Sequence, residues 1–356
     1  MLLGLQHARA RQIAYLLEDA RPPVLVTERA FVETLRAAGA FDIVPNIVVV
    51  DDEGGLGRVE GLGADGFDFD AAWRAVTPAD TLTLIYTSGT TGPPKGVQLT
   101  HANIQAEARA LVDAAPYPEH PTLVSYLPMA HIAERGLVHY LGMTLGSSVT
   151  CCPDPRLLGE HLVTTRPTAF GGVPLVWEKL KTGLELACGG PPPLERAEEA
   201  RAMVGLDRVE RTIGAAAAVP VEVLEFFAAI GITILELWGM SETTAVATIN
   251  RPGAHRFGTV GQALAGVELR LEDDSELLVR GDIVMTGYRN LPQQTAKALT
   301  PDGWLRTGDI ATIDDDGNVT IVDRKKELII NAAGKNMSPA NIESQLKVAS
   351  PLIGQA

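Results

Sequence analysis

The segment Tyr86–Gly96, which reads YTSGTTGPPKG, concentrates glycines, hydroxyl groups and one lysine. Glycines leave backbone N–H groups open to a ligand, and hydroxyls and an ammonium add further donors, so this composition favours binding of a polyphosphate. The candidate contacts are Thr87, Ser88, Gly89, Thr90, Thr91, Gly92 and Lys95. Pro94 stands where the Walker pattern needs its second glycine, which disfavours a P-loop NTPase. The alternative interpretation is a flexible surface turn.

Two further segments place a carboxylate beside small or polar residues. In Glu236–Thr244, ELWGMSETT, Glu242 follows Ser241, which could cap a strand-to-helix turn. In Gly303–Ile310, GWLRTGDI, Asp309 is a potential bidentate acceptor, because an ionised carboxylate offers two oxygens and no donor. The alternative for Asp309 is an aspartate in a β-turn.

Composition indicates a globular protein that does not bind nucleic acid. The 356 residues are 46% hydrophobic, and 44 acidic against 30 basic residues give a net charge of -14. Cys151, Cys152 and Cys188 form neither a disulfide framework nor a CxxC metal pattern, which fits a reducing cytosol. No apolar run has transmembrane length, so we expect a cytoplasmic protein with at most peripheral membrane contact.

Hydrophobic periodicity predicts an α/β fold that must position these residues. Between about Gln12 and Leu145, short apolar runs alternate with helix-period segments, as in a mainly parallel sheet covered by helices. The phosphate segment is expected to lead from the strand Leu82–Tyr86 to a helix that begins near His101. After Gly239, short strands and Asp/Gly-rich turns, the clearest at Asp314–Asn318, predict a smaller β-rich unit. Further expected strands are Ile47–Val50, Ser147–Cys151, Ile232–Leu237, Val267–Leu271, Leu277–Val279 and Val319–Val322. The expected helices are Asn103–Val112, Ile132–Tyr140, Arg156–Thr164 and Val221–Ala229. We expect a solvated loop and a surface helix over Gly189–Arg211.

These motifs, taken in order, resemble those of the adenylate-forming superfamily of acyl-CoA synthetases, peptide-synthetase adenylation domains and luciferases. The resemblance covers nearly the whole chain and includes Leu278–Tyr288, LVRGDIVMTGY. It implies that ATP is bound with its phosphates on Thr87–Lys95 and its adenine near Trp238 and Gly239. The hydroxyl of Ser241 would meet the α-phosphate.

The resemblance also implies a magnesium site and a ribose site. Magnesium would bind Glu242, with Thr87 as a second ligand, because an anionic carboxylate must attack an anionic phosphate. Asp309 would accept hydrogen bonds from the ribose hydroxyls, and Arg324 would contact ribose or phosphate.

Two more segments gain a role only through the resemblance. In Gly214–Pro220, GAAAAVP, Ala215 and Ala216 would line the adenine, although alanines replace the usual glycine pair and a packing turn explains the segment nearly as well. In LPMAHIAER, residues 127–135, His131 would lie near the acyl entrance, whereas a lone histidine at a helix start is otherwise a cap or a core residue. The candidate catalytic residues are therefore Glu242, Lys95 and His131.

The segment Ile321–Glu343 resembles the crossover into the family's small C-terminal domain. Lys326 would lie at the hinge on which that domain turns, and coenzyme A would pass the loop Ala332–Pro339. By composition alone, residues 324–326 are a solvated basic turn.

The chain differs from the family's usual extent at both ends. The resemblance implies that the chain begins downstream of the family's start and that, because it stops at Ala356, it does not include the family's C-terminal catalytic lysine. We expect a partial large AMP-binding domain at 1–250, a β-rich subdomain of the same domain at 251–322, and the hinge with the truncated start of a small α+β domain at 323–356. Missing strands would leave an open sheet edge.

The expected function is activation of a long-chain fatty acid as acyl-AMP, followed by transfer to coenzyme A. The long-chain preference rests on LPMAHIAER, on VPLVWEKL at 173–180 and on DRKKELIINAAGKNMSP at 323–339. The alternatives are a truncated, non-catalytic fragment that binds nucleotide or acyl-adenylate, and a ligase for another carboxylic acid. A structural protein derived from a decayed ligase would have no affinity for ATP.

Overall fold

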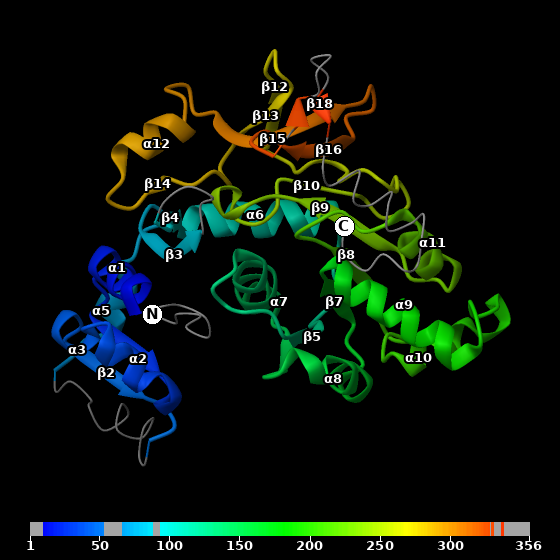
Figure 1. Cartoon of the computed structure of the whole chain (residues 1–356), viewed down its shortest axis with the longest axis horizontal. Coiled ribbons are helices and arrows are strands. Elements are labelled where there is room, and N and C mark those ends of the chain that lie inside the picture. Colours follow the sequence, from blue (N-terminus) through cyan, green and yellow to red (C-terminus); the bar gives the residue numbers. More distant parts are fainter. Residues whose placement is uncertain (1–9, 53–65, 88–92, 328, 331–335, 338–356) are drawn as a thin grey trace.

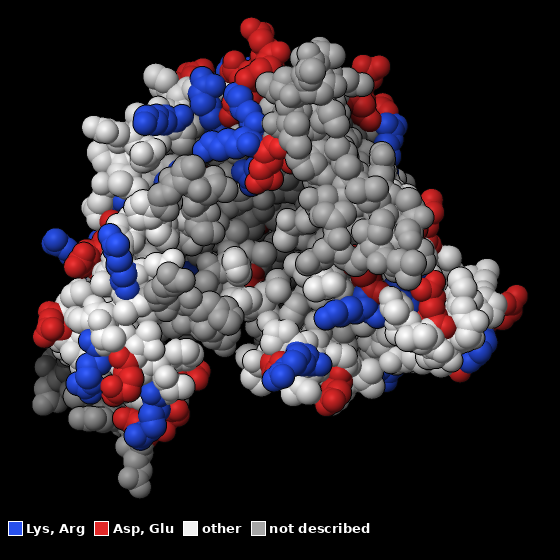
Figure 2. All heavy atoms as spheres, viewed as in Figure 1, with Lys and Arg blue, Asp and Glu red and all other residues white. Residues whose placement is uncertain are grey.

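Several small sheets with flanking helices make up the computed structural model, which describes residues 10–52, 66–87, 93–327, 329–330 and 336–337 (Figure 1). The α/β fold class expected from periodicity is confirmed. On the face drawn in Figure 2, basic and acidic side chains lie interspersed. Among the described residues, no helix combines the length and the hydropathy needed to span a bilayer.

The first layer is a small α/β unit at residues 10–52. Strands β1 (Val24–Thr27) and β2 (Asn46–Val49) pair in parallel beside helices α1 (Ala10–Ala20), α2 (Val32–Ala37) and α3 (Ala40–Ile43). Ile13, Leu17 and Leu25 are fully buried in its core. Helix α5 (Phe69–Arg74) follows and buries none of its residues.

The strand before the predicted phosphate segment belongs to an antiparallel sheet. Strand β3 (Thr81–Thr87) pairs with β4 (Lys95–Thr100), which pairs on its other side with β14 (Gly287–Tyr288). The expectation of a mainly parallel arrangement is therefore wrong for this part of the chain. Val97 and Leu99 point into the core, because alternate positions of a strand share one face.

The helix expected near His101 begins at that residue, but the expected strand–loop–helix order is wrong, because β4 intervenes between the predicted phosphate segment and the helix. Helix α6 (His101–Ala114) begins only after β4, where Thr100 and Asn103 form a reciprocal capping box. The N-terminus of α6 therefore does not follow the segment directly, and the segment joins the two strands of a hairpin instead.

Parallel pairing does hold in the central layers. Strands β5 (Thr122–Ser125) and β6 (Ser148–Cys151) form one parallel pair, and β7 (Ala169–Gly172), β8 (Arg211–Gly214) and β9 (Ile234–Trp238) form another parallel set. Strands β10 (Thr248–Ile249) and β11 (Gln262–Ala263) extend the latter set antiparallel. The helices around these strands are α8 (Leu158–Thr165), α9 (Pro174–Cys188), α10 (Ala197–Met203) and α11 (Val221–Ala229).

The indole of Trp177, which is fully buried, joins α9 to two of the parallel strands. Its N–H donates to the carbonyl oxygen of Gly172 at 3.1 Å and of Ile213 at 3.2 Å. Residues 189–211 are less solvated than expected, because Leu206 is fully buried and Ala200 is 1% exposed.

The predicted helix Ile132–Tyr140 forms as a π-helix, η3 (Ala133–Tyr140), that continues into α7 (Leu141–Leu145). Two residues of η3 attach it to neighbouring strands. The buried carboxylate of Glu134 accepts from the hydroxyl of Ser125, and Arg135 donates to the Thr83 hydroxyl at 2.7 Å and the Met129 carbonyl at 2.8 Å. π-Helical turns are often found at functional sites.

The expected β-rich unit is an antiparallel sheet in the order β12–β13–β15–β16. Its strands are β12 (Glu268–Leu271), β13 (Glu276–Arg280), β15 (Leu305–Ile313) and β16 (Val319–Arg324), with α12 (Pro292–Ala298) before β15. Short strands β17 (Ile329–Ile330) and β18 (Asn336–Met337) follow. The predicted turn at Asp314–Asn318 is confirmed, since the N–H of Asp314 donates to the carbonyl of Asn318 at 3.0 Å.

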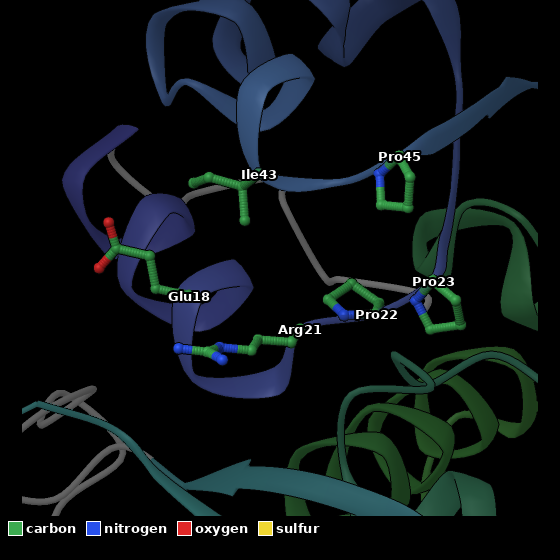
Figure 3. Close-up of a pocket in the computed structure, with 6 residues that line it drawn as sticks. All are labelled: Glu18, Arg21, Pro22, Pro23, Ile43 and Pro45. Carbon is green, nitrogen blue, oxygen red and sulfur yellow. The ribbon is translucent and has the colours of Figure 1, made fainter.

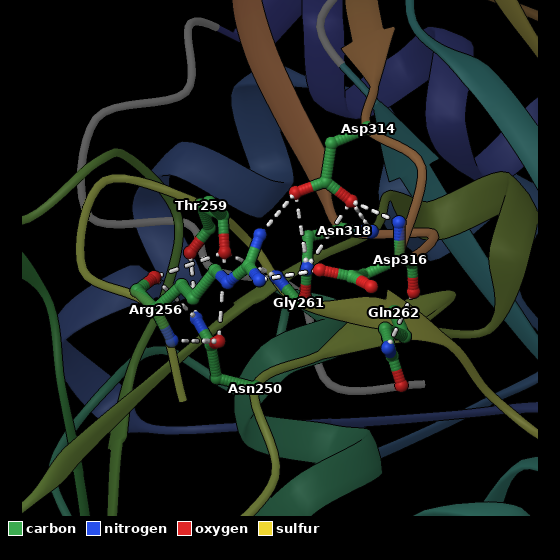
Figure 4. Close-up of polar contacts among 8 residues, drawn as sticks. All are labelled: Asn250, Arg256, Thr259, Gly261, Gln262, Asp314, Asp316 and Asn318. Carbon is green, nitrogen blue, oxygen red and sulfur yellow. Dashed lines mark hydrogen bonds and ion pairs between the residues drawn. The ribbon is translucent and has the colours of Figure 1, made fainter. Parts of the chain in front are cut away.

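A polar network ties this sheet to the strands that precede it (Figure 4). Arg256 donates to Asp314 at 2.7 Å and to Asp316 at 2.5 Å, and Gln262 donates to the Asp316 carbonyl at 2.7 Å. Asn250 donates to the carbonyl of Thr259 at 2.6 Å and holds the connecting loop. The network therefore joins the loop between β10 and β11 to the turn between β15 and β16.

Helix α6 carries a carboxyl group that the fold buries without a hydrogen bond. Glu107 is 1% exposed, and its Oε1 has no partner among the described residues. Desolvation by burial raises its pKa from 4.5 to about 8, so the folded chain holds this group neutral at pH 7.

We expect Glu107→Gln to flatten the pH dependence of stability. Between pH 5 and 8, about the interval between its unfolded and folded pKa values, wild-type Glu107 binds more protons folded than unfolded, so raising the pH lowers the free energy of unfolding. The glutamine variant lacks this contribution, which chemical denaturation across that range would measure. Parallel curves for the two proteins would contradict the assignment.

Candidate functional site

The strand hairpin positions the two described ends of the predicted phosphate segment. Thr87 at the end of β3 lies opposite Lys95 at the start of β4. Ser88, Gly89, Thr90, Thr91 and Gly92 lie outside the described residues. One residue further from the tip, Tyr86 lies opposite Gly96, where a Cβ atom would approach the Tyr86 ring to 3.0 Å. Glycine at this position therefore makes room for the tyrosine.

Tyr86 also attaches the hairpin to the first layer. Its hydroxyl donates to Asp19 at 2.6 Å, and desolvation together with this carboxylate raises the pKa of Tyr86. Arg289 donates to the carbonyl oxygens of Asp19 at 2.8 Å and Ala20 at 3.1 Å. The cationic side chain thus binds the C-terminal end of α1, where free carbonyls favour positive charge.

A tyrosine links the predicted metal ligand to the predicted phosphate lysine. The hydroxyl of Tyr288 in β14 donates to Oε1 of Glu242 at 2.8 Å, and the ammonium of Lys95 lies 4.5 Å from the centre of the Tyr288 ring. Tyr288 is 7% exposed, and burial followed by the Glu242 charge raises its pKa. Glu242 and Lys95, far apart in sequence, therefore contact the same residue, Glu242 at the hydroxyl of Tyr288 and Lys95 at the face of its ring.

The backbone around Glu242 is unusually constrained. Thr244 and Ala245 have φ angles of +61° and +109°, a region that residues with a side chain rarely adopt. A Cβ atom at Gly239 would lie 2.1 Å from the carbonyl oxygen of Ala245. Only glycine at 239 permits this close approach, which folds residues 239–245 into a tight turn.

Asp309 forms a second cluster with two other predicted residues. Its Oδ1 pairs with Arg324 Nε at 2.8 Å, and its Oδ2 accepts from the Trp238 indole at 2.9 Å. Asp309 is 2% exposed. Burial raises its pKa, and the nearby charges of Asp323 and Glu242 add to this, while Arg324 opposes it. The structure thus brings together three predicted residues, and places Glu242 within electrostatic range of them.

The remaining predicted site residues belong to neither of these two clusters. Ser241 is half-buried in the short helix η6 (Ser241–Thr243), which packs against β4, and the side chain of His131 is exposed. Ala215 follows β8, and Ala216 has a φ of +73°. The position therefore has the conformation that glycine adopts without strain.

Sequence reasoning missed Tyr288 and Glu236 as individual residues. Tyr288 ended a segment that had been noticed, but its bond to Glu242 required the pairing of β14 with β4. Glu236, 3% exposed, accepts from the N–H of Val219 at 3.3 Å and of Gly258 at 3.2 Å, and burial raises its pKa to about 7. It joins the alanine-rich segment to the loop after β10.

A pocket of about 400 Å³ lies elsewhere, at the end of α1 (Figure 3). It is lined by Glu18, Arg21, Pro22, Pro23, Ile43 and Pro45. None of these residues belongs to the two clusters, so the chemistry of the site does not involve this pocket.

Comparison with known proteins decides the family. The family of AMP-binding enzymes matches residues 6–289. The chain belongs to the AMP-binding enzyme family. The chain is 44% identical over 329 residues to a putative fatty-acid–CoA ligase, FadD11, of Mycobacterium tuberculosis, covering 82% of the chain and 58% of that protein. It is 34% identical to the long-chain-fatty-acid–CoA ligase FadD15 of Mycobacterium bovis, covering 98% of the chain and 64% of that protein.

Solved structures agree with this assignment. ATP-bound MatB of Rhodopseudomonas palustris has a TM-score of 0.79 and 26% identity, covering 96% of this chain and 66% of that one. The AMP complex of the O-succinylbenzoate coenzyme A synthetase MenE of Bacillus subtilis has a TM-score of 0.76 and 25% identity, covering 97% and 67%. The chain spans 58% to 64% of the length of the two curated relatives.

We expect Tyr288→Phe to destabilise the chain by about 1–3 kcal/mol, because the change leaves a buried oxygen of Glu242 without its donor. Equilibrium unfolding in urea would measure the loss, and the ring beneath Lys95 is retained. Tyr140→Phe is the control, since its hydroxyl has no hydrogen bond among the described residues. Equal effects of the two variants would contradict the role of the Tyr288 hydroxyl.

We expect Ala216→Gly to stabilise the fold by up to about 1 kcal/mol, because glycine adopts a positive φ without the steric cost of a Cβ. The neighbouring Ala217, which lacks a positive φ, is the matched control. Ala217→Gly should instead lower the free energy of unfolding, by about 0.5 kcal/mol. A loss of stability in Ala216→Gly equal to that in Ala217→Gly would refute this.

Proposed function

We propose that this chain binds ATP and activates a long-chain fatty acid as acyl-AMP, which then reacts with coenzyme A. The observation that carries the proposal is the pair of adjoining clusters, Lys95–Tyr288–Glu242 and Trp238–Asp309–Arg324. They offer an ammonium and a carboxylate for a polyphosphate and its cation, and an aromatic ring with a carboxylate for a nucleoside. The names of the curated relatives support a fatty acid as the substrate, and FadD15 supports a long one.

In this proposal, Asp309 receives the ribose hydroxyls. Both of its oxygens already accept hydrogen bonds from protein donors, from Arg324 and from Trp238. Each oxygen has a further lone pair, so the ribose hydroxyls would share these acceptors with the protein. Trp238 would then lie beside the adenine base. The hydrogen bond from its indole N–H to Asp309 would limit the rotation of the indole ring.

The carboxylate of Glu242 fits a magnesium ion, with Thr87 as a proposed second ligand. Magnesium in proteins takes one or two protein oxygens together with phosphate oxygens. Oε1 of Glu242 is oriented by Tyr288, and Oε2 has no hydrogen-bond partner among the described residues, so it is available to a cation. A bound magnesium ion would neutralise charge on the phosphates during attack by the fatty carboxylate.

Lys95, oriented over the Tyr288 ring, would contribute a further positive charge to the departing pyrophosphate. His131, an exposed residue before η3, would lie on the acyl side, and Lys326 would lie at the hinge on which the small C-terminal domain turns before coenzyme A displaces AMP. Ser241 would meet the α-phosphate, and Ala215 and Ala216 would line the adenine. A cytoplasmic location with at most peripheral membrane contact fits such water-soluble co-substrates.

Fatty-acid-dependent exchange of pyrophosphate into ATP by the purified chain tests the proposal, with calorimetric titration of ATP beside it. We expect exchange in the wild type and a loss of about 10²–10³ in its rate in Glu242→Ala. Glu198→Ala, which removes an exposed glutamate from α10, is the control and should leave exchange unchanged. Binding of ATP without exchange would replace the proposal with the non-catalytic alternative, and no binding by a folded chain would refute both.

A further inference from the structure

One buried carboxylate contacts the chain on both sides of the Asp309–Arg324 pair. Glu276, at the start of β13, is 6% exposed. Its Oε1 accepts from the N–H of Gly308 at 3.1 Å, and its Oε2 receives the ammonium of Lys325 at 2.7 Å. Gly308 directly precedes Asp309, and Lys325 directly follows Arg324.

The backbone at Gly308 depends on these contacts. Gly308 has a φ of +73°, and the register of β15 against β16 shifts between Ile310 and Ala311. Its carbonyl accepts from the N–H of Lys325 at 2.8 Å. The N–H of Gly308 therefore binds the Glu276 carboxylate and its carbonyl binds the backbone N–H of Lys325, two residues before the irregular point of the strand that carries Asp309.

Charge makes Lys325 necessary to this arrangement. Its ammonium lies between Glu276 and Asp274, 2.7 Å and 2.6 Å away, and these hydrogen bonds raise the pKa of Lys325. A carboxylate as buried as Glu276 is costly to ionise without a cationic partner. Loss of the lysine would leave the Glu276 carboxylate without its cationic partner, so the carboxylate would move towards water and its bond to Gly308 would weaken.

We propose that Lys325 and Glu276 are positioning residues that hold Asp309 in the orientation needed to accept the ribose hydroxyls of a nucleotide. Neither residue touches the ribose in this proposal. They act through Gly308. Its hydrogen bonds to the Glu276 carboxylate and to the Lys325 backbone N–H set the direction in which the Asp309 side chain points from β15. The inference rests on the proposed function, in which Asp309 is the ribose acceptor.

The experiment compares two nucleotides that differ only at the ribose. Calorimetry would give the Kd of ATP and of 2′,3′-dideoxy-ATP, which lacks both hydroxyls. For the wild type we expect ATP to bind at least about tenfold more tightly than the dideoxy analogue, the usual size of a charge-assisted hydrogen bond. In Lys325→Met we expect this ratio to fall to about threefold or less, while the Kd of the dideoxy analogue changes little.

Two control variants separate positioning from a general loss of charge or stability. Lys325→Arg keeps a cation between the two carboxylates and should restore most of the wild-type ratio. Lys297→Met removes an exposed lysine of α12 that belongs to neither cluster, and should keep the ratio unchanged. Thermal unfolding of each variant, and hydrogen exchange at Gly308 and Asp309, would show that Lys325→Met is folded and that the strand is loosened locally.

The outcomes distinguish the inference from the proposed function. A wild-type ratio that persists in a folded Lys325→Met protein overturns the inference alone. Weakening of both nucleotides by the same factor in Lys325→Met also overturns it, because the pair would then be only a structural contact of the sheet. A wild type that binds ATP and the dideoxy analogue equally, or binds neither, overturns the ribose role of Asp309 and the inference with it.

Discussion

The carboxylate of Asp309 joins two sheets that share no strand among the described residues. It lies on β15, accepts from Trp238 at the end of β9, and pairs with Arg324 on β16. A carboxylate 2% exposed must be paired, and removal of one partner of a buried ion pair typically costs about 3–5 kcal/mol. The relative placement of the two sheets is therefore linked to the electrostatics of the same side chain that would receive a nucleoside.

The antiparallel hairpin of β3 and β4 makes the corresponding connection for the proposed phosphate site. Strand β4 begins at Lys95 and pairs with β14, which brings Tyr288 beneath that lysine and beside Glu242. Three segments far apart in sequence thus converge through backbone pairing, with a single tyrosine hydroxyl orienting the carboxylate. The tight turn after Gly239 has φ angles that cost energy, and such strain persists where the surrounding structure holds it.

Agreement between prediction and structure was good where the signal was local. The helix expected at Val221–Ala229 has those bounds, the strand expected at Ser147–Cys151 forms at Ser148–Cys151, and the turn at Asp314–Asn318 closes as expected. The error at the phosphate segment arose because Lys95–Thr100 is too short for periodicity to separate a strand from the approach to a helix. Its partner strands, β3 and β14, settle its conformation, and β14 lies nearly two hundred positions away.

By itself, the sequence determined which chemical groups are available: the hydroxyl- and glycine-rich segment, the carboxylates Glu242 and Asp309, and the cationic side chains Lys95 and Arg324. Side-chain type and local spacing are sufficient for that, because they are properties of short segments. Only the tertiary structure decided which of these groups share a partner. Three side-chain hydrogen bonds show this: Tyr288 to Glu242, Trp238 to Asp309 and Lys325 to Glu276. All three depend on strand pairing or packing between distant segments, and no local pattern encodes the register of such contacts.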